Sequence, residues 1–199
     1  MPKQVDRQER RRALADAVFA VVAERGLEAV SLREVAARAG VSMGAVQHYF
    51  STKEELLRFA LDHLRERVLR RLRSTVEQLS GPSRRDLVEA GLQVMLPLTE
   101  EGRQEASVNV AFVARAMTDE AYAALLREGY ERLLAASRLQ LRQARDAGEL
   151  AAGVDPDHAA VALYLLSQGL IAPVVVGVLS TVEARAILAR ELDRIFVAC

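Results

Sequence analysis

The side chains able to do chemistry in this chain are few and far apart in the sequence. The three histidines are His48, His63 and His158, and the single cysteine is Cys199. A transition-metal site needs several such ligands close together, so we expect no metal site. There is no glycine-rich phosphate loop and no nucleophile elbow, and the carboxylates share polar helix faces with Arg and Lys. We therefore expect no catalytic residue and no cofactor, with an all-helical enzyme as an alternative.

Polar and basic side chains instead gather between residues 31 and 56, which read SLREVAARAGVSMGAVQHYFSTKEEL. These side chains bind partners through hydrogen bonds and ion pairs. Ser31 is a typical helix N-cap with a glutamate three residues later, which predicts a helix over 32–39. Ser42 is a second N-cap and predicts another short helix over 43–49.

Ala36, Gly40 and Val46 have the spacing of a helix-turn-helix. This unit needs a small residue where its helices touch, a glycine in the left-handed turn and an apolar anchor on the second helix. The outward side chains of the second helix are small or polar, namely Met43, Gly44, Ala45, Gln47 and His48. Such a surface enters a DNA major groove without a clash, whereas an ordinary helical hairpin is the alternative interpretation.

The rest of the chain must position this unit, and it reads almost entirely as helix. We expect a loose polar arm over 1–8 and a first helix over about 7–25, which Gly26 ends. A fourth helix over about 53–79 would be roughly 40 Å long, enough to connect two domains. Its arginines are expected to lie in solvent. They are Arg65, Arg67, Arg70, Arg71 and Arg73. Later helices are expected over 84–100 with a kink at Pro97, 104–117, 120–147, 157–178 and 182–197.

Composition and charge fit a soluble globular protein with one basic end. Hydrophobic residues make up 51% and charged residues 27% of the chain, which excludes a disordered or low-complexity protein. Residues 1–53 hold nine Lys/Arg against six Asp/Glu, whereas residues 54–199 hold eighteen against twenty-one. The basic end is therefore the candidate surface for a polyanion. Its run Arg10–Arg12 either contacts phosphates or is a solvated charge run, and we favour the second.

Residues 159–182 carry no charge and are long enough to cross a membrane. Polar or helix-breaking residues interrupt the stretch, namely Ser167, Gln168, Gly169, Pro173 and Gly177. A helix buried inside a soluble protein explains it equally well, and we expect no membrane contact. Because the single cysteine cannot form an intrachain disulfide, a reducing cytoplasm is the expected compartment.

The segment from Arg11 to Leu64 resembles the DNA-binding domain of the TetR family of bacterial transcriptional regulators. The residues that carry the resemblance are Phe19 and Gly26, the run SLREVA, the run AGVS followed by Gly44 and Ala45, Tyr49 with Phe50, and the run KEEL from Lys53. The remaining two-thirds of the chain matches this family in its helical plan. It is faintly similar to the betaine-regulator type within the family.

The resemblance implies an all-α protein with an N-terminal three-helix DNA-binding domain over 1–52 and a larger helical domain over 53–199. It implies a homodimer that binds a palindromic operator on double-stranded DNA and is released by a small-molecule effector. A repressor is expected, with an activator of the same fold as the alternative. A helical interaction protein that binds no DNA is a further alternative.

By position, the resemblance also implies the residues that touch DNA. They are Ser31, Arg33, Ser42, Met43, Gly44, Ala45, Gln47, His48, Tyr49 and Lys53. Many family members carry Tyr where this chain has Gln47, and that Tyr usually contacts a phosphate. Gln47 either reads adenine through two hydrogen bonds or lies in solvent as an ordinary surface glutamine.

An effector cavity is expected among the middle helices of the larger domain. Its candidate lining residues are Met95, Asn109, Phe112, Met117, Tyr122, Tyr130, Tyr164 and Gln168. Asn109 interrupts an apolar run, so if buried it needs a protein partner or a ligand. No cationic cluster lies in the apolar segments, which favours a neutral or cationic, largely apolar effector. The alternative is that most of these side chains are simply core.

The last two helices are expected to pair with their copies in a four-helix dimer interface. The stretch over 159–182 is apolar all round, so one face should meet its own core and another should need a partner. The residues expected at the interface are Leu170, Val174, Leu188, Leu192 and Ile195.

Overall fold

The computed structural model of the protein describes residues 2–197, with side chains from residue 7 onward. Throughout these residues the secondary structure is helical apart from one isolated β-bridge between Leu150 and Phe196. The elements are α1 (Pro2–Arg25), the 3₁₀ turn η1 (Leu27–Ala29), α2 (Leu32–Ala39), α3 (Met43–Tyr49), α4 (Lys53–Glu77), α5 (Arg84–Gln93), α6 (Glu100–Ala116), α7 (Glu120–Asp146), α8 (Pro156–Val175) and α9 (Thr181–Ile195). The predicted all-α class is confirmed.

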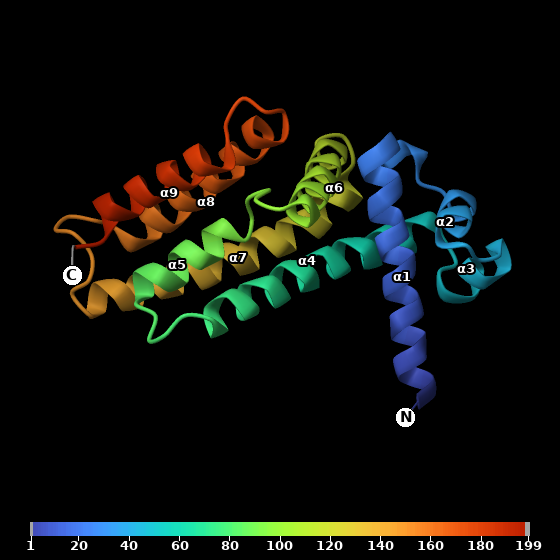
Figure 1. Cartoon of the computed structure of the whole chain (residues 1–199), viewed down its shortest axis with the longest axis horizontal. Helices are drawn as coiled ribbons and strands as arrows, with labels where there is room; N and C mark the ends of the chain where they lie inside the picture. Colours follow the sequence, from blue (N-terminus) through green and yellow to red (C-terminus); the bar gives the residue numbers. More distant parts are fainter. Residues whose placement is uncertain (1, 198–199) are drawn as a thin grey trace.

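The helices form a small head and a larger body (Figure 1). The head contains α1, α2 and α3 at one end of the molecule. The body contains α5 to α9, and the C-terminus lies at its far end. Helix α4 runs from the head along the body, and α6 packs against α1 where head and body meet. The protein is thus two helical units that share one long helix.

Local signals explain why the head helices begin and end where they do. The Ser31 hydroxyl accepts a hydrogen bond from the Glu34 amide at 3.1 Å, and the Ser42 hydroxyl accepts one from the Ala45 amide at 3.1 Å. Gly40 ends α2 with φ 65°, a left-handed conformation that glycine adopts without strain. These caps reproduce the predicted bounds 32–39 and 43–49.

The start of α1 and the end of α5 differ from the sequence-based expectation. Helix α1 begins at Pro2, so the loose arm expected over 1–8 is wrong for the described residues, and Met1 lies outside them. A guanidinium–aromatic contact helps to hold this region, because Arg11 lies 4.2 Å from the Phe59 ring centroid. Helix α5 ends at Gln93, four residues before Pro97, instead of continuing through a kink to residue 100.

Two buried clusters hold the two units together internally. The first joins α1, α2, α3 and the start of α4, and extends to Val108 and Phe112 of α6 and Leu126 of α7. The second joins α5, α7, α8 and α9 around side chains such as Leu163 and Leu188. The first cluster therefore bonds the head to the body as well as filling the head.

Candidate nucleic-acid interface

Helix α3 is anchored on one face and open on the other. Val46 and Phe50 are fully buried in the head core. The Val41 amide donates to the Ala36 carbonyl at 3.0 Å, which closes the turn between α2 and α3. The short helix therefore has a fixed orientation, and its remaining side chains stand on a rigid support.

Most side chains expected to touch DNA lie exposed on this open side. Ser31, Arg33, Ser42, Met43, Gly44, Gln47 and His48 are exposed, and Ala45, Tyr49 and Lys53 are half-buried. The Met43 side chain is 41% exposed despite being apolar. The His48 and Tyr49 rings meet edge to face with centroids 5.1 Å apart. The structure thus brings the predicted contact residues together along α3 and the entries to α2 and α4.

Lys53 marks the point where this surface meets the body. It is the first residue of α4, whose N-cap Thr52 accepts a hydrogen bond from the Glu55 amide at 3.1 Å. A helix N-terminus carries partial positive charge, which adds to that of Lys53. This arrangement can hold an anionic group such as a backbone phosphate.

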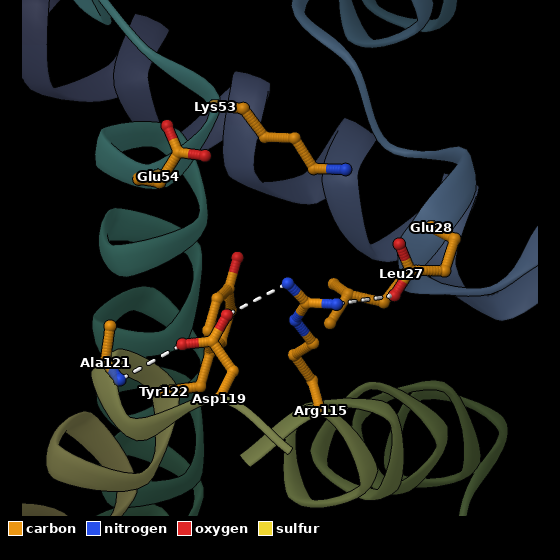
Figure 2. A pocket seen from close by; sticks show the side chains of 8 residues that line it. All are labelled: Leu27, Glu28, Lys53, Glu54, Arg115, Asp119, Ala121 and Tyr122. Atoms are coloured by element: carbon orange, nitrogen blue, oxygen red, sulfur yellow. Dashed lines mark hydrogen bonds and ion pairs between the residues drawn. The ribbon is translucent and has the colours of Figure 1, made fainter.

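A hollow of about 180 Å³ lies behind Lys53, between head and body (Figure 2). Its lining comes from η1, α4, α6 and α7, namely Leu27, Glu28, Lys53, Glu54, Arg115, Asp119, Ala121 and Tyr122. Arg115 crosses it, with its guanidinium 2.9 Å from Asp119 and 3.5 Å from Glu28. The charges are largely paired within the hollow, so we assign it no ligand.

The residues predicted to line one effector cavity lie in separate places. Phe112 and Tyr122 pack together, with ring centroids 6.1 Å apart, in the cluster that joins head and body. Met117 is 83% exposed after the end of α6, so its predicted place inside a cavity is wrong for this conformation. Asn109 is half-buried and so retains contact with solvent.

Four of these predicted residues form two pairs in the body, and α8 supplies one member of each pair. The Tyr130 and Tyr164 rings lie 5.8 Å apart between centroids, at 60° to each other. Burial raises the pKa of Tyr164, and the neighbouring Tyr130 raises it further, so this hydroxyl stays neutral. Gln168, one turn along α8 from Tyr164, directs its amide Nε2 to the Met95 sulfur at 3.8 Å.

The predicted dimer contacts are wrong, because all five side chains face the core of their own chain. Leu188 and Leu192 are fully buried, Val174 is 2% exposed, and Leu170 and Ile195 are 6% exposed. Helix α8 has two apolar faces, and the predicted residues Leu170 and Val174 lie on the inner one. Periodicity does not distinguish the faces when both are apolar.

The outer face of α8 carries a different apolar stripe. It consists of Ala162, Leu165, Gly169, Ala172 and Val176, all exposed. We call these five residues the α8 stripe. Their spacing of three and four residues is that of a helix seam, and three of the five are small enough to allow close helix approach.

Helix α8 is also long and apolar enough to span a membrane by length and composition, with 44% of its window buried inside the protein. Its buried half packs on α7 and α9.

Comparison with known proteins supports the same division of the chain. A family model described as bacterial regulatory proteins of the tetR family matches residues 14–59. A second model, described as the C-terminal part of a BetI-type transcriptional repressor, matches residues 82–197. Most of α4, including the arginines beyond residue 59, lies between the two matches.

Among curated relatives, the chain is 42% identical over 121 residues to the HTH-type transcriptional regulator PksA of Bacillus subtilis. That match covers 58% of this chain and 56% of PksA. The chain is 34% identical over 126 residues to the regulator BetI of Rhizobium meliloti, covering 63% of this chain and 53% of BetI. It thus spans about half the length of the curated relatives it matches.

Solved structures match over nearly the whole chain. A transcriptional regulator from Rhodococcus sp. is 33% identical with a TM-score of 0.77, covering 92% of this chain and 93% of that one. A regulator from Saccharomonospora viridis in complex with choline has the same fold, with a TM-score of 0.83 at 21% identity over 96% of this chain and 100% of that one. The chain therefore belongs to the TetR family of bacterial transcriptional regulators, with a C-terminal domain of the BetI type.

Proposed function

We propose that this protein is a cytoplasmic, one-component transcriptional repressor that binds an inverted-repeat operator as a homodimer and leaves it when a small molecule binds. The observation that supports DNA binding best is the open side of α3. It presents Gln47, His48 and small residues on a helix whose opposite face is locked in the core. A short rigid helix with this surface suits the major groove.

The residues divide into two kinds of contact. Met43, Gly44, Ala45 and Gln47 lie where base edges would come within reach, because they occupy the open side of α3. Lys53, Ser31 and Arg33 stand at the entries to helices, which suits phosphate contacts. The first kind gives sequence preference, whereas the second gives affinity that falls with salt.

Dimerisation is proposed through the α8 stripe instead of the residues first predicted. Leu165 is 60% and Val176 is 72% exposed in one protomer. Exposed apolar side chains in a row of this length favour a partner surface. A second copy of α8, related by a two-fold axis, would cover the stripe with its own small residues. Val182 at the start of α9 is another exposed apolar side chain, with 74% of its surface open to solvent.

The effector is proposed to contact the group formed by Tyr130, Tyr164, Gln168 and Met95. These side chains combine aromatic faces with one amide, and aromatic faces attract cations and apolar groups alike. The structural neighbour from Saccharomonospora viridis was solved with choline, a small cation. A neutral or cationic, largely apolar effector remains our prediction.

Selection of genomic fragments by the purified protein tests the DNA-binding proposal. We expect enrichment of fragments that share an inverted repeat with half-sites about one helical turn or a multiple apart. Position relative to a promoter then separates repressor from activator. A folded dimer that enriches no fragment would support a non-regulatory interaction protein and contradict the proposal.

A screen of small amines and neutral apolar compounds against the protein–operator complex tests the effector proposal. Released DNA identifies effectors, and the midpoint of release is then measured for Tyr164→Ala, for Gln168→Ala and for Phe112→Ala. Tyr164→Ala should shift the midpoint. Phe112→Ala tests the separate aromatic pair that Phe112 forms with Tyr122. Unchanged midpoints for Tyr164→Ala and Gln168→Ala would show that the effector binds elsewhere.

A further inference from the structure

The arginines of α4 are not all in solvent, and Arg67 departs furthest from that expectation. Its side chain is only 15% exposed, whereas Arg70 and Arg73 on the same helix are exposed. Its Nη1 donates to Asp16 Oδ1 of α1 at 3.1 Å. Its Nη2 donates to Glu101 of α6, and its Nε lies 2.9 Å from Glu105 Oε1, also on α6. One guanidinium thus joins three helices.

Glu105 is the buried carboxylate of this cluster. Its side chain is 4% exposed, and few glutamates are buried so deeply without a paired cation. Arg71, one turn after Arg67 on α4, donates to the same carboxylate and also to the Val94 carbonyl at 2.7 Å. Two arginines of α4 therefore neutralise one buried acid of α6.

On the α1 side of the cluster, the partners are Asp16 and Phe19. His63 is 4% exposed, and its Nε2 lies 3.0 Å from Asp16 Oδ1. The His63 ring stacks on Phe19 at 5.7 Å between centroids, and the Arg67 guanidinium lies 5.4 Å from the Phe19 centroid. Asp16 thus receives hydrogen bonds from two side chains of α4.

The charges in this cluster stabilise one another. Burial opposes ionisation of Asp16, but the hydrogen bond from His63 and the charge of Arg67 leave its pKa below the usual value. Burial likewise opposes the charge of Arg67, and Glu101, Glu105 and Asp16 nonetheless raise its pKa. The guanidinium therefore stays charged, and each of the three carboxylates would lose one charged partner if Arg67 were removed.

A second charged contact between head and body is much weaker. Arg115 near the end of α6 lies 3.5 Å from Glu28 of η1, and Glu28 is 81% exposed. An exposed pair at that distance contributes little, because water and salt screen it. Among the described residues, Arg67 therefore makes a much better buried charged contact between head and body than Arg115 does.

We propose that Arg67 is a positioning residue for operator binding: by bridging Asp16 of α1 to Glu101 and Glu105 of α6, it fixes the orientation of the head on the body. The inference rests on the proposed dimeric, operator-binding function. A dimer gains affinity from two heads only when their separation and angle match the two half-sites. A head that turns on the body loses part of that gain, although each head still binds one half-site normally.

The test compares two DNAs of equal length, one with both half-sites and one with a single half-site. Arg67→Met removes the guanidinium and keeps an unbranched apolar stem beside Phe19. We expect its affinity for the double site to fall about 10- to 100-fold, in the usual range of coupling between sites, with single-site affinity unchanged. The matched control is Arg70→Met on the same helix, whose guanidinium is half-exposed and pairs only with Glu66 at 3.8 Å among the contacts found in the described chain.

Three results would decide the matter. Equal loss on both DNAs would mean that Arg67 merely supports the fold of the head, and no loss on either would mean that it restrains nothing. Both results overturn the proposal. A wild-type protein that does not prefer the double site instead contradicts the proposed function. If Arg67→Met does not fold, Arg67→Lys and Glu105→Gln carry the test, and an unchanged ratio of double-site to single-site affinity in both would also overturn it.

Discussion

Helices α3 and α8 each leave one face uncovered in the protomer, but the two faces differ in polarity. Helix α3 buries Val46 and exposes Gln47 and His48, which water solvates well. Helix α8 buries Leu163 and Val174 and exposes Leu165, which water does not. The polar face of α3 is well solvated in the free protein and suits a partner that binds and dissociates. The apolar face of α8 favours a permanent apolar partner.

The composition of an exposed helix face therefore indicates its partner, because polar and apolar faces differ in the free energy needed to leave them in contact with water. A polar face binds a charged polymer and releases it, because both surfaces remain hydrated in the free state. Leaving an apolar stripe open costs roughly 25 cal/mol per Å² of exposed apolar surface. The predictions that follow test whether the two faces behave in these two ways.

The largest expected effect is on the free energy of unfolding, and it distinguishes the inner face of α8 and α9 from their outer face. Leu188→Ala should lower the free energy of unfolding by about 2–5 kcal/mol, because it opens a cavity in a fully buried site. Denaturant unfolding at several protein concentrations measures this loss, which should be similar at all of them. For Leu165→Ala the loss should instead depend on protein concentration, since it acts through the dimer. A small effect of Leu188→Ala would contradict its assignment to the core.

A second substitution tests whether the α8 stripe binds a second copy. Leu165→Glu places a charge in the stripe and should convert the dimer to a folded monomer, measured by light scattering and circular dichroism. Leu139→Glu is the matched control, since Leu139 is 54% exposed on α7, and the dimer should persist. A Leu165→Glu protein that stays dimeric would remove the stripe from the interface.

A third substitution tests the polar face through its dependence on salt. Lys53→Ala should weaken binding to all DNA sequences alike and reduce the slope of log affinity against log salt by about one. Binding titrations at four or five salt concentrations give the slope. Arg73→Ala, an exposed substitution far along α4, should leave the slope unchanged. An unchanged slope for Lys53→Ala would mean that this lysine does not touch a phosphate.

The smallest expected effect concerns the cap that sets the start of α3. Ser42→Ala should cost about 1 kcal/mol of stability without DNA, because the Ala45 amide loses its 3.1 Å acceptor. Ser42→Gly should cost only a few tenths of a kcal/mol by the same rule. Thermal unfolding of the three proteins gives the order, and equal melting temperatures for all three would show that the cap is not needed.

The head was predictable because its signals are local. Ser31, Gly40 and Ser42 contact backbone groups only a few residues away, so their effect can be predicted from the local sequence. The same is true of Asp155 and Pro156, which cap and begin α8. The resemblance to a known family then supplied the function of that local pattern.

The rest could not be predicted because it depends on contacts between distant segments. Whether Leu170 or Leu165 faces the core is decided by where α7 and α9 pack, since both side chains are apolar. Arg67 reads as a solvated arginine until α6 brings Glu105 beside it. Phe112 looks like a candidate for an effector cavity until it is found in the cluster shared with the head. These three errors have the same origin, a tertiary contact that periodicity does not encode.

The central claim is that the open side of α3 reads DNA bases, and binding to operator variants tests it most directly. Every base pair of a selected operator is changed in turn, and affinities are measured for the wild type and for Gln47→Ala. We expect the wild type to lose about 1–3 kcal/mol at a base pair that Gln47→Ala no longer distinguishes, with the other positions unaffected. Identical base preferences for the wild type, Gln47→Ala and Met43→Ala would contradict the claim.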